Sequence, residues 1–215
     1  MENIITEAMA YIREFFQKDA SGHDAYHSIR VYRTALKIAG EEKADTQVVA
    51  LAALLHDVDD FKLSPETAAG KDNAACFLRR HQVPEQIISQ ILHIIEQVSF
   101  MGKDSVRPDT LEGKCVQDAD RLDALGAIGI ARVFAYGGSH NRPIYDPEEK
   151  PAMDMSREEY RVHKSTSINH FHEKLLLLKE LMNTQTGKRL ARSRTEYMEE
   201  YLSRFYSEWD GDDAI

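Results

Sequence analysis

Residues 48–59 of the chain read Val-Val-Ala-Leu-Ala-Ala-Leu-Leu-His-Asp-Val-Asp. The first eight are apolar, so a helix built from them is apolar on nearly every side, which is typical of a helix buried at the centre of a fold. The pair His56-Asp57 follows directly. A charged carboxylate at the end of such a helix is costly unless a cation or hydrogen-bond donors compensate it. The stretch therefore predicts a central helix whose end presents a histidine and an aspartate, and a metal ion is one object that both could hold.

The remainder of the chain carries the apolar spacing of three to four residues that is typical of helices, as in Ile29, Tyr32, Leu36 and Ala39. Sustained alternation with a period of two is absent, so we expect an all-α fold. Asp24 and Asp45 are suited to cap the helices that follow them. The expected helices span about residues 2–18, 24–40, 46–59, 66–81, 84–98, 109–125, 126–135, 156–183 and 187–208.

The chain has 215 residues, a length that suits one domain with a single substantial core. We expect residues 1–215 to form one helical-bundle domain, with a core at about 20–135 and C-terminal helices at 156–208 packed on that core. Residues 136–155 lack a helical pattern. A connection of this length is uncommon in a compact domain, so the segment is interpreted either as a lid or binding loop or as a surface excursion.

The composition excludes several classes of protein. With 42% hydrophobic and 29% charged residues the chain is a folded, soluble type, and it contains no apolar run long enough to span a membrane. The N-terminal segment does not resemble a secretory signal. Two isolated cysteines exclude a disulfide framework and favour the cytoplasm. A net charge of −9 argues against a nucleic-acid partner, and the oligomeric state stays open.

A second informative stretch is Val116-Gln-Asp-Ala-Asp-Arg-Leu-Asp-Ala-Leu-Gly-Ala-Ile-Gly129. It is mostly apolar but holds three carboxylates, those of Asp118, Asp120 and Asp123. Asp118 and Asp120 point about 200° apart on a helix, so both cannot face water when the rest of the helix faces a core. At least one of them is therefore expected in the interior or in a cleft.

The set His27, His56-Asp57 and Asp120 resembles the H…HD…D pattern of the HD-domain metal-dependent phosphohydrolases. The resemblance covers most of the chain and is strongest to small bacterial HD proteins similar to nucleotide pyrophosphohydrolases. It rests on Leu54-Leu-His-Asp-Val-Asp-Asp60, on the stretch around Asp120, and on His170-Phe-His-Glu-Lys-Leu-Leu176. What it implies is an all-α HD bundle with a central metal site.

The resemblance implies that His27, His56, Asp57 and Asp120 ligate one divalent metal ion. Two imidazoles and two carboxylates suit Mn²⁺, Fe²⁺, Co²⁺, Ni²⁺ or Zn²⁺ better than Mg²⁺, which prefers an all-oxygen site. The implied substrate is a nucleotide or another phosphate-bearing small molecule, with conversion of a (deoxy)nucleoside triphosphate to monophosphate and pyrophosphate as the leading reaction. Nucleotidase or phosphodiesterase action at the same site, or a nucleotide-sensing module without turnover, are the alternatives.

Related HD hydrolases carry an acidic residue at the position of Asp60, so Asp60 is the candidate general base and Asp59 the alternative. Arg121 follows the ligand Asp120, where similar enzymes place a basic residue near the substrate phosphate, and a guanidinium matches phosphate geometry. An ion pair with a neighbouring aspartate is the other interpretation of Arg121. Further candidates for substrate binding are His93, Lys62, Lys174 and Arg30.

Two variants of the metal site stay open at this stage. HD families with two metals carry additional histidines, and His81 or His93 could complete a second site bridged by Asp57. The run His23-Asp-Ala-Tyr-His27 has two histidines four residues apart, as in zinc-protease helices, but with aspartate in place of glutamate. His23 also follows Ser21-Gly22, which favours a turn position for it.

Overall fold

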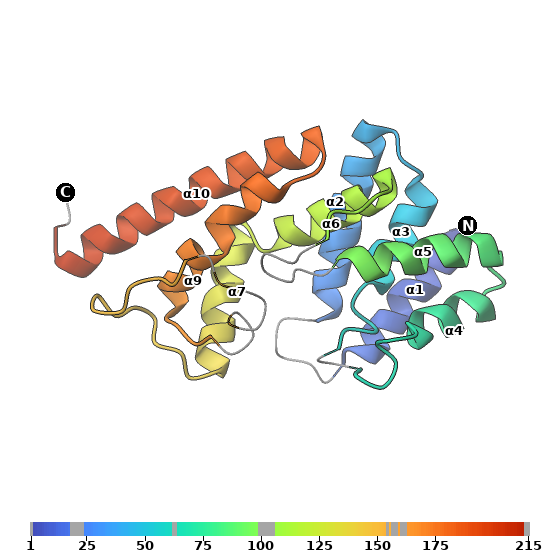
Figure 1. Cartoon of the computed structure of the whole chain (residues 1–215), viewed down its shortest axis with the longest axis horizontal. Coiled ribbons are helices and arrows are strands. Elements are labelled where there is room, and N and C mark those ends of the chain that lie inside the picture. Colours follow the sequence, from blue (N-terminus) through green and yellow to red (C-terminus); the bar gives the residue numbers. More distant parts are fainter. Residues whose placement is uncertain are drawn as a thin grey trace.

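The computed structural model of the chain describes residues 2–17, 24–61, 64–98, 106–153, 155, 159 and 163–212. Within these residues the structure is helical and contains no strand, which confirms the expected all-α fold (Figure 1). The helices are α1 (Glu2–Phe15), α2 (Ala25–Glu42), α3 (Thr46–Leu55), α4 (Asp72–Arg80), α5 (Glu85–Val98), α6 (Leu111–Asp123), α7 (Gly126–Ser139), α9 (Ser167–Glu173), the 3₁₀ helix η2 (Leu175–Leu181) and α10 (Gln185–Asp210).

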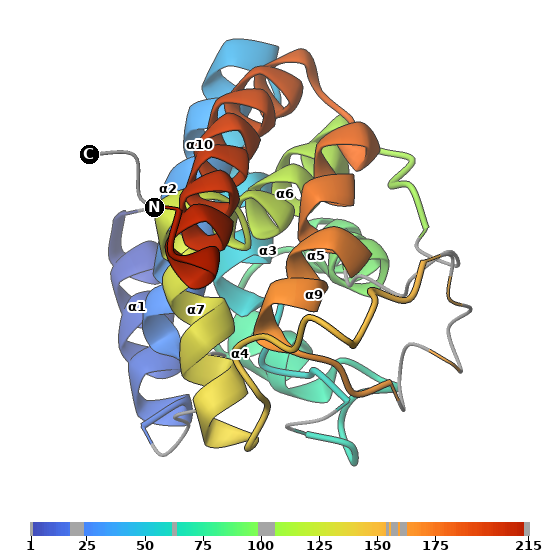
Figure 2. The same ribbon diagram turned by 90° about the vertical axis from the view of Figure 1, so that its left-hand side faces the viewer.

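Helix α3 lies at the centre of the bundle, as its apolar sequence predicts. Every residue from Val48 to Leu55 is buried. Helices α1, α2, α5 and α6 pack against it, so each of its sides meets another helix (Figures 1 and 2). A helix enclosed in this way has no solvated face, which explains why the run needs no polar stripe.

Capping aspartates set the start of the two helices that carry the histidines. The Asp24 carboxylate accepts a hydrogen bond from the His27 amide at 2.7 Å, so His27 lies in the first turn of α2. The Asp45 carboxylate accepts from the amides of Gln47 and Val48 at the start of α3. Both expected caps are therefore confirmed. They satisfy amides that have no partner within the helix.

Helices α7, α9, η2 and α10 form the other half of the molecule, and the long helix α10 reaches back to α2 and α6 (Figure 1). The buried Asp118 carboxylate anchors this half. It accepts hydrogen bonds from the amides of Asn183 and Thr184, both at 2.8 Å, and from the Thr184 hydroxyl at 2.7 Å. A Cβ at Gly187 would lie 2.2 Å from Asp118 Oδ2, so only glycine allows this approach. The expectation that an aspartate of this stretch enters the interior is confirmed.

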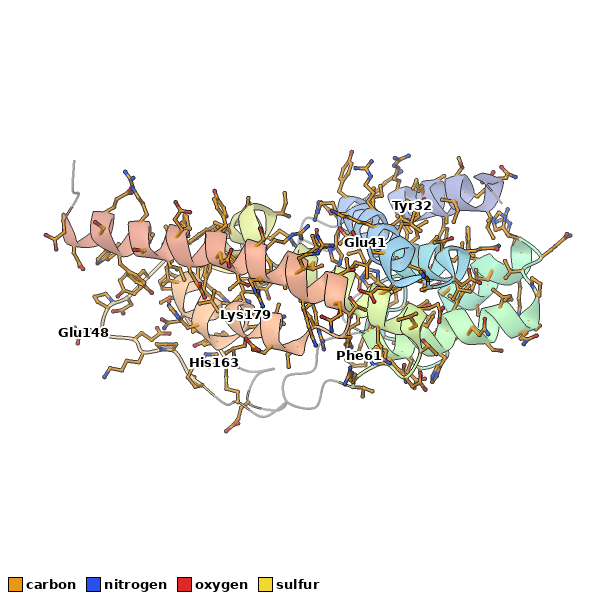
Figure 3. The ribbon with its side chains drawn as sticks, turned by 90° about the horizontal axis from the view of Figure 1, so that it is seen from above. Tyr32, Glu41, Phe61, Glu148, His163 and Lys179 are labelled. Carbon is orange, nitrogen blue, oxygen red and sulfur yellow. The ribbon has the colours of Figure 1, made fainter. Side chains whose placement is uncertain are left out.

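Polar contacts on the surface hold α10 against η2 and against the end of α2. Lys179 on η2, labelled in Figure 3, contacts Glu199 on α10 at 3.1 Å. At the start of α10 the Thr186 amide donates to Glu42 Oε1 at 2.8 Å, and Arg189 pairs with Glu41, so α10 is tied to the end of α2.

Two expected helices are shorter than the pattern predicts, because contacts with distant residues set their starts. The predicted helix 66–81 begins only at Asp72, since the Asp59 carboxylate accepts the amides of Asn73 and Ala74 and so caps α4. The predicted helix 156–183 is replaced in the described residues by α9 and η2. Thr166 caps α9, and the Ser167 amide donates to the Pro143 carbonyl.

Smaller differences concern helix ends and the long connection. The predicted helix 46–59 ends at Leu55, with His56 as its last capping residue. Helix α7 continues to Ser139, so the connection starts later than expected.

Cys115 is buried, whereas Cys76 is exposed. Among the helices that the structure describes, none combines the length and apolar character needed to cross a membrane.

Candidate metal centre

Three helices bring the four expected ligands to one point at the C-terminal end of α3. His27 comes from the first turn of α2, and Asp120 comes from the last turn of α6. His27 Nε2 lies 3.4 Å from Asp57 Oδ2 and 3.3 Å from Asp120 Oδ1. His56 Nε2 lies 3.3 Å from Asp57 Oδ1 and 3.8 Å from Asp120 Oδ1. These separations are similar to those between neighbouring ligands of one ion at about 2.1 Å.

Each imidazole is oriented by a hydrogen bond at its other nitrogen. His27 Nδ1 lies 2.7 Å from Asp123 Oδ2, and His56 Nδ1 lies 2.9 Å from the Ala53 carbonyl. Since a carboxylate and a carbonyl can only accept, both Nδ1 atoms carry the proton. In the neutral imidazoles both Nε2 atoms therefore present a lone pair to the point between the aspartates, which is the arrangement of metal-ligating histidines.

The donor set fits a divalent cation. His56 Nε2 is buried and makes no hydrogen bond with any described residue, although it faces two carboxylates. An orphaned buried lone pair of this kind is costly unless a cation binds it. Among the described residues, His27, His56 and Asp57 form the one cluster of three or more potential ligands whose atoms lie within 4.8 Å of one another.

The charges of the site attract cations. Burial by itself would lower the pKa of His27, but hydrogen bonds to Asp120, Asp123 and Asp57 raise it well above its ordinary value. Burial would likewise raise the pKa of Asp120, but the hydrogen bond from His27 lowers it overall. Protons and metal ions compete for the same histidine lone pairs in such a site.

Asp120 is the most exposed of the four expected ligands. Its side chain is 23% exposed, whereas those of His27 and His56 are 3% exposed. Asp120 is therefore the expected ligand most accessible from outside, while the histidines stay shielded from water.

A buried ion-pair cluster behind His27 holds its ring in place. Asp123 accepts from Arg30 Nε at 2.7 Å and from Arg30 Nη2 at 2.9 Å, and it also accepts from Arg132 Nη1. Burial would raise the pKa of Asp123, but the hydrogen bonds from His27 and Arg30 lower it well below its ordinary value. The Asp123 carboxylate therefore stays charged, and it fixes the tautomer and the direction of His27.

Replacing Asp123 by asparagine is expected to weaken metal binding about 10–100-fold, because an amide no longer forces the proton onto His27 Nδ1. Titration of the metal-free protein with Mn²⁺ in a calorimeter measures this change. Asp109→Asn serves as the control, because Asp109 lies on the surface and pairs with His93. Equal Mn²⁺ affinity in Asp123→Asn and in the unsubstituted protein would contradict a role for Asp123 in orienting the ligand.

The two candidate bases lie in different surroundings. Asp59 is buried, and both of its oxygens accept backbone amides of α4, so the structure uses it as a helix cap. Asp60 is half-buried and lies in the turn after α3, where its amide donates to the Asp57 carbonyl at 3.1 Å. The next residue, Phe61, is exposed, so this turn reaches the surface (Figure 3).

The candidate phosphate-binding arginines are engaged elsewhere. Arg121 is buried and donates to the Leu181 carbonyl, and burial lowers the pKa of its guanidinium. Arg121 therefore donates a hydrogen bond to the η2 segment, while the charges of Asp118 and Asp120 act on its guanidinium. Its role in phosphate binding stays a prediction. The Arg30 guanidinium is paired with Asp123 through two of its nitrogens.

The other candidates lie on different elements. His93 is exposed on α5, where its Nε2 lies 3.0 Å from the Asp109 carboxylate. His81 ends α4 and its ring lies 4.4 Å from that of Phe77, so neither histidine joins a second metal cluster within the described residues. Lys174 lies half-buried at the break between α9 and η2. Lys62 and His23 lie outside the described residues.

Sequence reasoning missed the roles of Asp123 and Arg132. The spacing of three residues between Asp120 and Asp123 is a usable signal, because residues three apart lie on one helix face. The contribution of Arg132 has no local signal, since Arg132 belongs to α7 and meets Asp123 only through the packing of α7 on α6.

Comparison with known proteins identifies the family. Residues 24–125 match the HD domain model. YpgQ of Bacillus subtilis, an uncharacterized protein, is 35% identical over 206 residues, which cover 95% of this chain and 93% of YpgQ. The chain belongs to the HD-domain family, and it is a metal-dependent phosphohydrolase.

Solved structures agree with this assignment. A protein of Lactobacillus plantarum has a TM-score of 0.85 and 40% identity, with 98% of each chain covered. An HD-superfamily hydrolase of Bacillus thuringiensis has a TM-score of 0.78 and 42% identity, covering 97% of this chain and 98% of its own. YpgQ in complex with ADP has a TM-score of 0.73 and 32% identity, covering 95% of this chain and all of the other.

Proposed function

We propose that this chain hydrolyses nucleotides and that its leading reaction converts a (deoxy)nucleoside triphosphate to monophosphate and pyrophosphate. The observation that carries the nucleotide part is the ADP bound to YpgQ, a relative of the same fold that covers nearly the whole chain. The ligand cluster supports it, because two histidines and two aspartates face one point and Asp120 is the most exposed of the four.

We propose Mn²⁺ or a similar transition-metal ion for the centre, because imidazole ligands disfavour Mg²⁺. When bound, the ion supplies a Lewis acid for a phosphoryl oxygen and for the attacking water. His27, His56, Asp57 and Asp120 would hold it. Asp123 accepts a hydrogen bond from His27 Nδ1 and so keeps the His27 ring oriented toward the ion.

Asp60 is the proposed general base. It lies three residues after Asp57, in a turn that is closed by the hydrogen bond from the Asp60 amide to the Asp57 carbonyl. We propose that its carboxylate takes a proton from a water molecule that approaches the ligands from outside. Asp59 is unsuited to the role because both of its oxygens already accept amide hydrogen bonds.

Product analysis tests the proposed reaction. The full chain is incubated with Mn²⁺ and a panel of ribo- and deoxynucleotides, and the products are separated by anion-exchange chromatography. We expect monophosphate and pyrophosphate from triphosphates, because attack at the α-phosphorus breaks the α–β bond. The Asp57→Ala variant, which lacks a ligand, should form neither product.

Other results have distinct meanings. Nucleoside and phosphate released from monophosphates would replace the proposed reaction by a nucleotidase reaction at the same site. Hydrolysis of cyclic nucleotides would indicate a phosphodiesterase. Failure to form any metal-dependent product, together with nucleotide binding in a calorimeter, would overturn the proposal in favour of a nucleotide-sensing module.

A further inference from the structure

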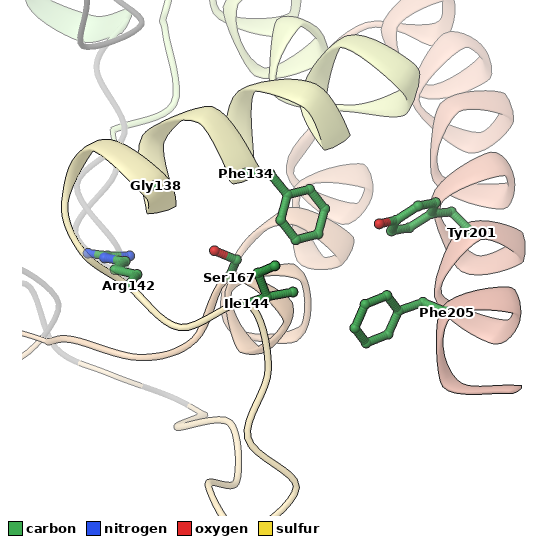
Figure 4. A pocket seen from close by; sticks show the side chains of 7 residues that line it. All are labelled: Phe134, Gly138, Arg142, Ile144, Ser167, Tyr201 and Phe205. Atoms are coloured by element: carbon green, nitrogen blue, oxygen red, sulfur yellow. The ribbon is translucent and has the colours of Figure 1, made fainter. Parts of the chain in front are cut away.

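A pocket lies between α7, α9 and α10, and none of its lining residues is a candidate metal ligand. Its volume is about 370 Å³, within the range of small-molecule sites. Figure 4 shows that its walls come from segments far apart in the sequence: the end of α7, the connection after it, the start of α9 and the outer half of α10.

The two ends of the pocket differ in chemistry. Phe134, Tyr201 and Phe205 form an aromatic end, with Phe134 and Tyr201 at a ring-centroid distance of 6.1 Å. Arg142 lies at the opposite end, and the Ser167 hydroxyl points toward it (Figure 4). An aromatic wall favours a flat apolar body, whereas a guanidinium favours an anionic group.

The guanidinium of Arg142 is available for an anion. It is half-buried and lies over the Tyr136 ring at 5.2 Å, and it forms no ion pair with a described carboxylate. Positive charge also gathers nearby: burial, together with Lys174 and Arg142, lowers the pKa of His170 to about 3. This end of the pocket therefore attracts negative charge.

Two glycines at the end of α7 shape the pocket. A Cβ at Gly137 would lie 2.3 Å from Ser167 Oγ, so glycine permits the close approach of α9. A Cβ at Gly138 would meet no atom within 4 Å, although Gly138 lines the pocket. The space in front of Gly138 is therefore open, so a Cβ at this pocket-lining position displaces no neighbour.

We propose that this pocket binds a small amphipathic anion, with a flat apolar body at the aromatic end and a carboxylate, sulfonate or phosphate group at Arg142. The proposal is independent of the reaction at the metal centre. The aromatic end, formed by Phe134, Tyr201 and Phe205, excludes water from the apolar body of the ligand. The Ser167 hydroxyl donates a hydrogen bond to the anionic group beside the guanidinium.

The test uses 8-anilino-1-naphthalenesulfonate, an aromatic monoanion that fluoresces in apolar sites. We expect saturable binding of one probe per chain. The single tryptophan, Trp209, should transfer excitation to it, because its ring lies 5.9 Å from that of Phe205. Gly138→Leu should weaken binding about tenfold or more by filling the pocket, and Arg142→Gln about fivefold with a smaller salt dependence.

Gly40→Leu is the matched control, because Gly40 is also helical and a Cβ there meets no atom within 4 Å. It should bind the probe like the unsubstituted chain. Circular dichroism checks the folding of each variant. If Gly138→Leu fails to fold, the probe affinity of Arg142→Gln tests the proposal. Absent or non-saturable binding, or equal affinity in all variants, would overturn the proposal. If light scattering shows that the chain forms dimers and that only Gly138→Leu loses them, the pocket binds a second copy of the chain, and this result would also overturn the proposal.

Discussion

Replacing Asp57 by alanine is expected to remove the divalent metal from the chain and to lower phosphohydrolase activity about a thousandfold or more. Asp57 faces both histidines, with 3.4 Å to His27 and 3.3 Å to His56, so its loss opens the centre of the ligand set. Metal binding also stabilises the folded chain, by about 4 kcal/mol when the free metal is a thousand times its dissociation constant. The variant should lose this increment.

Metal content after dialysis and thermal unfolding with Mn²⁺ or with a chelator measure both effects. The unsubstituted chain should melt at a higher temperature with Mn²⁺ than with the chelator, whereas Asp57→Ala should melt at the same temperature in both. Asp109→Ala, which removes an exposed carboxylate, controls for a general loss of charge. Equal metal content and an equal Mn²⁺-induced shift in Asp57→Ala would show that Asp57 is not a ligand.

Replacing Asp60 by asparagine is expected to lower kcat about 10²–10⁴-fold while metal content stays unchanged. Asparagine has nearly the same size as aspartate but cannot accept a proton at neutral pH. Because the ligand set is intact, the Mn²⁺-induced shift in melting temperature should persist. This separates the base from the ligands, since the Asp57 variant loses metal and activity together.

Asp59→Asn is the matched control for Asp60→Asn. Asp59 caps α4, so its replacement should lower stability by about 1 kcal/mol and leave kcat nearly unchanged. Steady-state kinetics and thermal unfolding of both variants distinguish the two roles. Retained turnover in Asp60→Asn with loss of turnover in Asp59→Asn would reverse the assignment of the base.

Local patterns predicted most of the helices. The apolar run from Val48 to Leu55 indicated the buried helix α3, and Asp24 and Asp45 indicated the starts of α2 and α3. These predictions succeed because a cap and its amides lie within a few residues of each other. The helix expected at 66–81 was too long, since its start depends on Asp59, whose partner Asn73 lies 14 residues away.

The candidate ligands were found through a resemblance, because His27 and Asp120 are far apart in the sequence and their spacing alone does not bring them together. In the structure His27 Nε2 lies 3.3 Å from Asp120 Oδ1, because α2 packs along α6. The phosphate-binding role expected for Arg121 rested on its place next to Asp120. Adjacent helix residues point about 100° apart, and Arg121 donates a hydrogen bond to the Leu181 carbonyl, so the phosphate-binding role stays a prediction.

Sequence patterns alone predict a helical chain with a buried central helix that ends in His56-Asp57, and they include residue types able to bind a divalent ion. The packing of the helices shows which carboxylates gather at the candidate metal centre and which join or cap helices. Asp123 orients His27 from 96 residues away, and Asp118 anchors Asn183 from 65 residues away. The reason is physical: a carboxylate's role depends on the donors that surround it, and packing between helices brings those donors from distant parts of the chain.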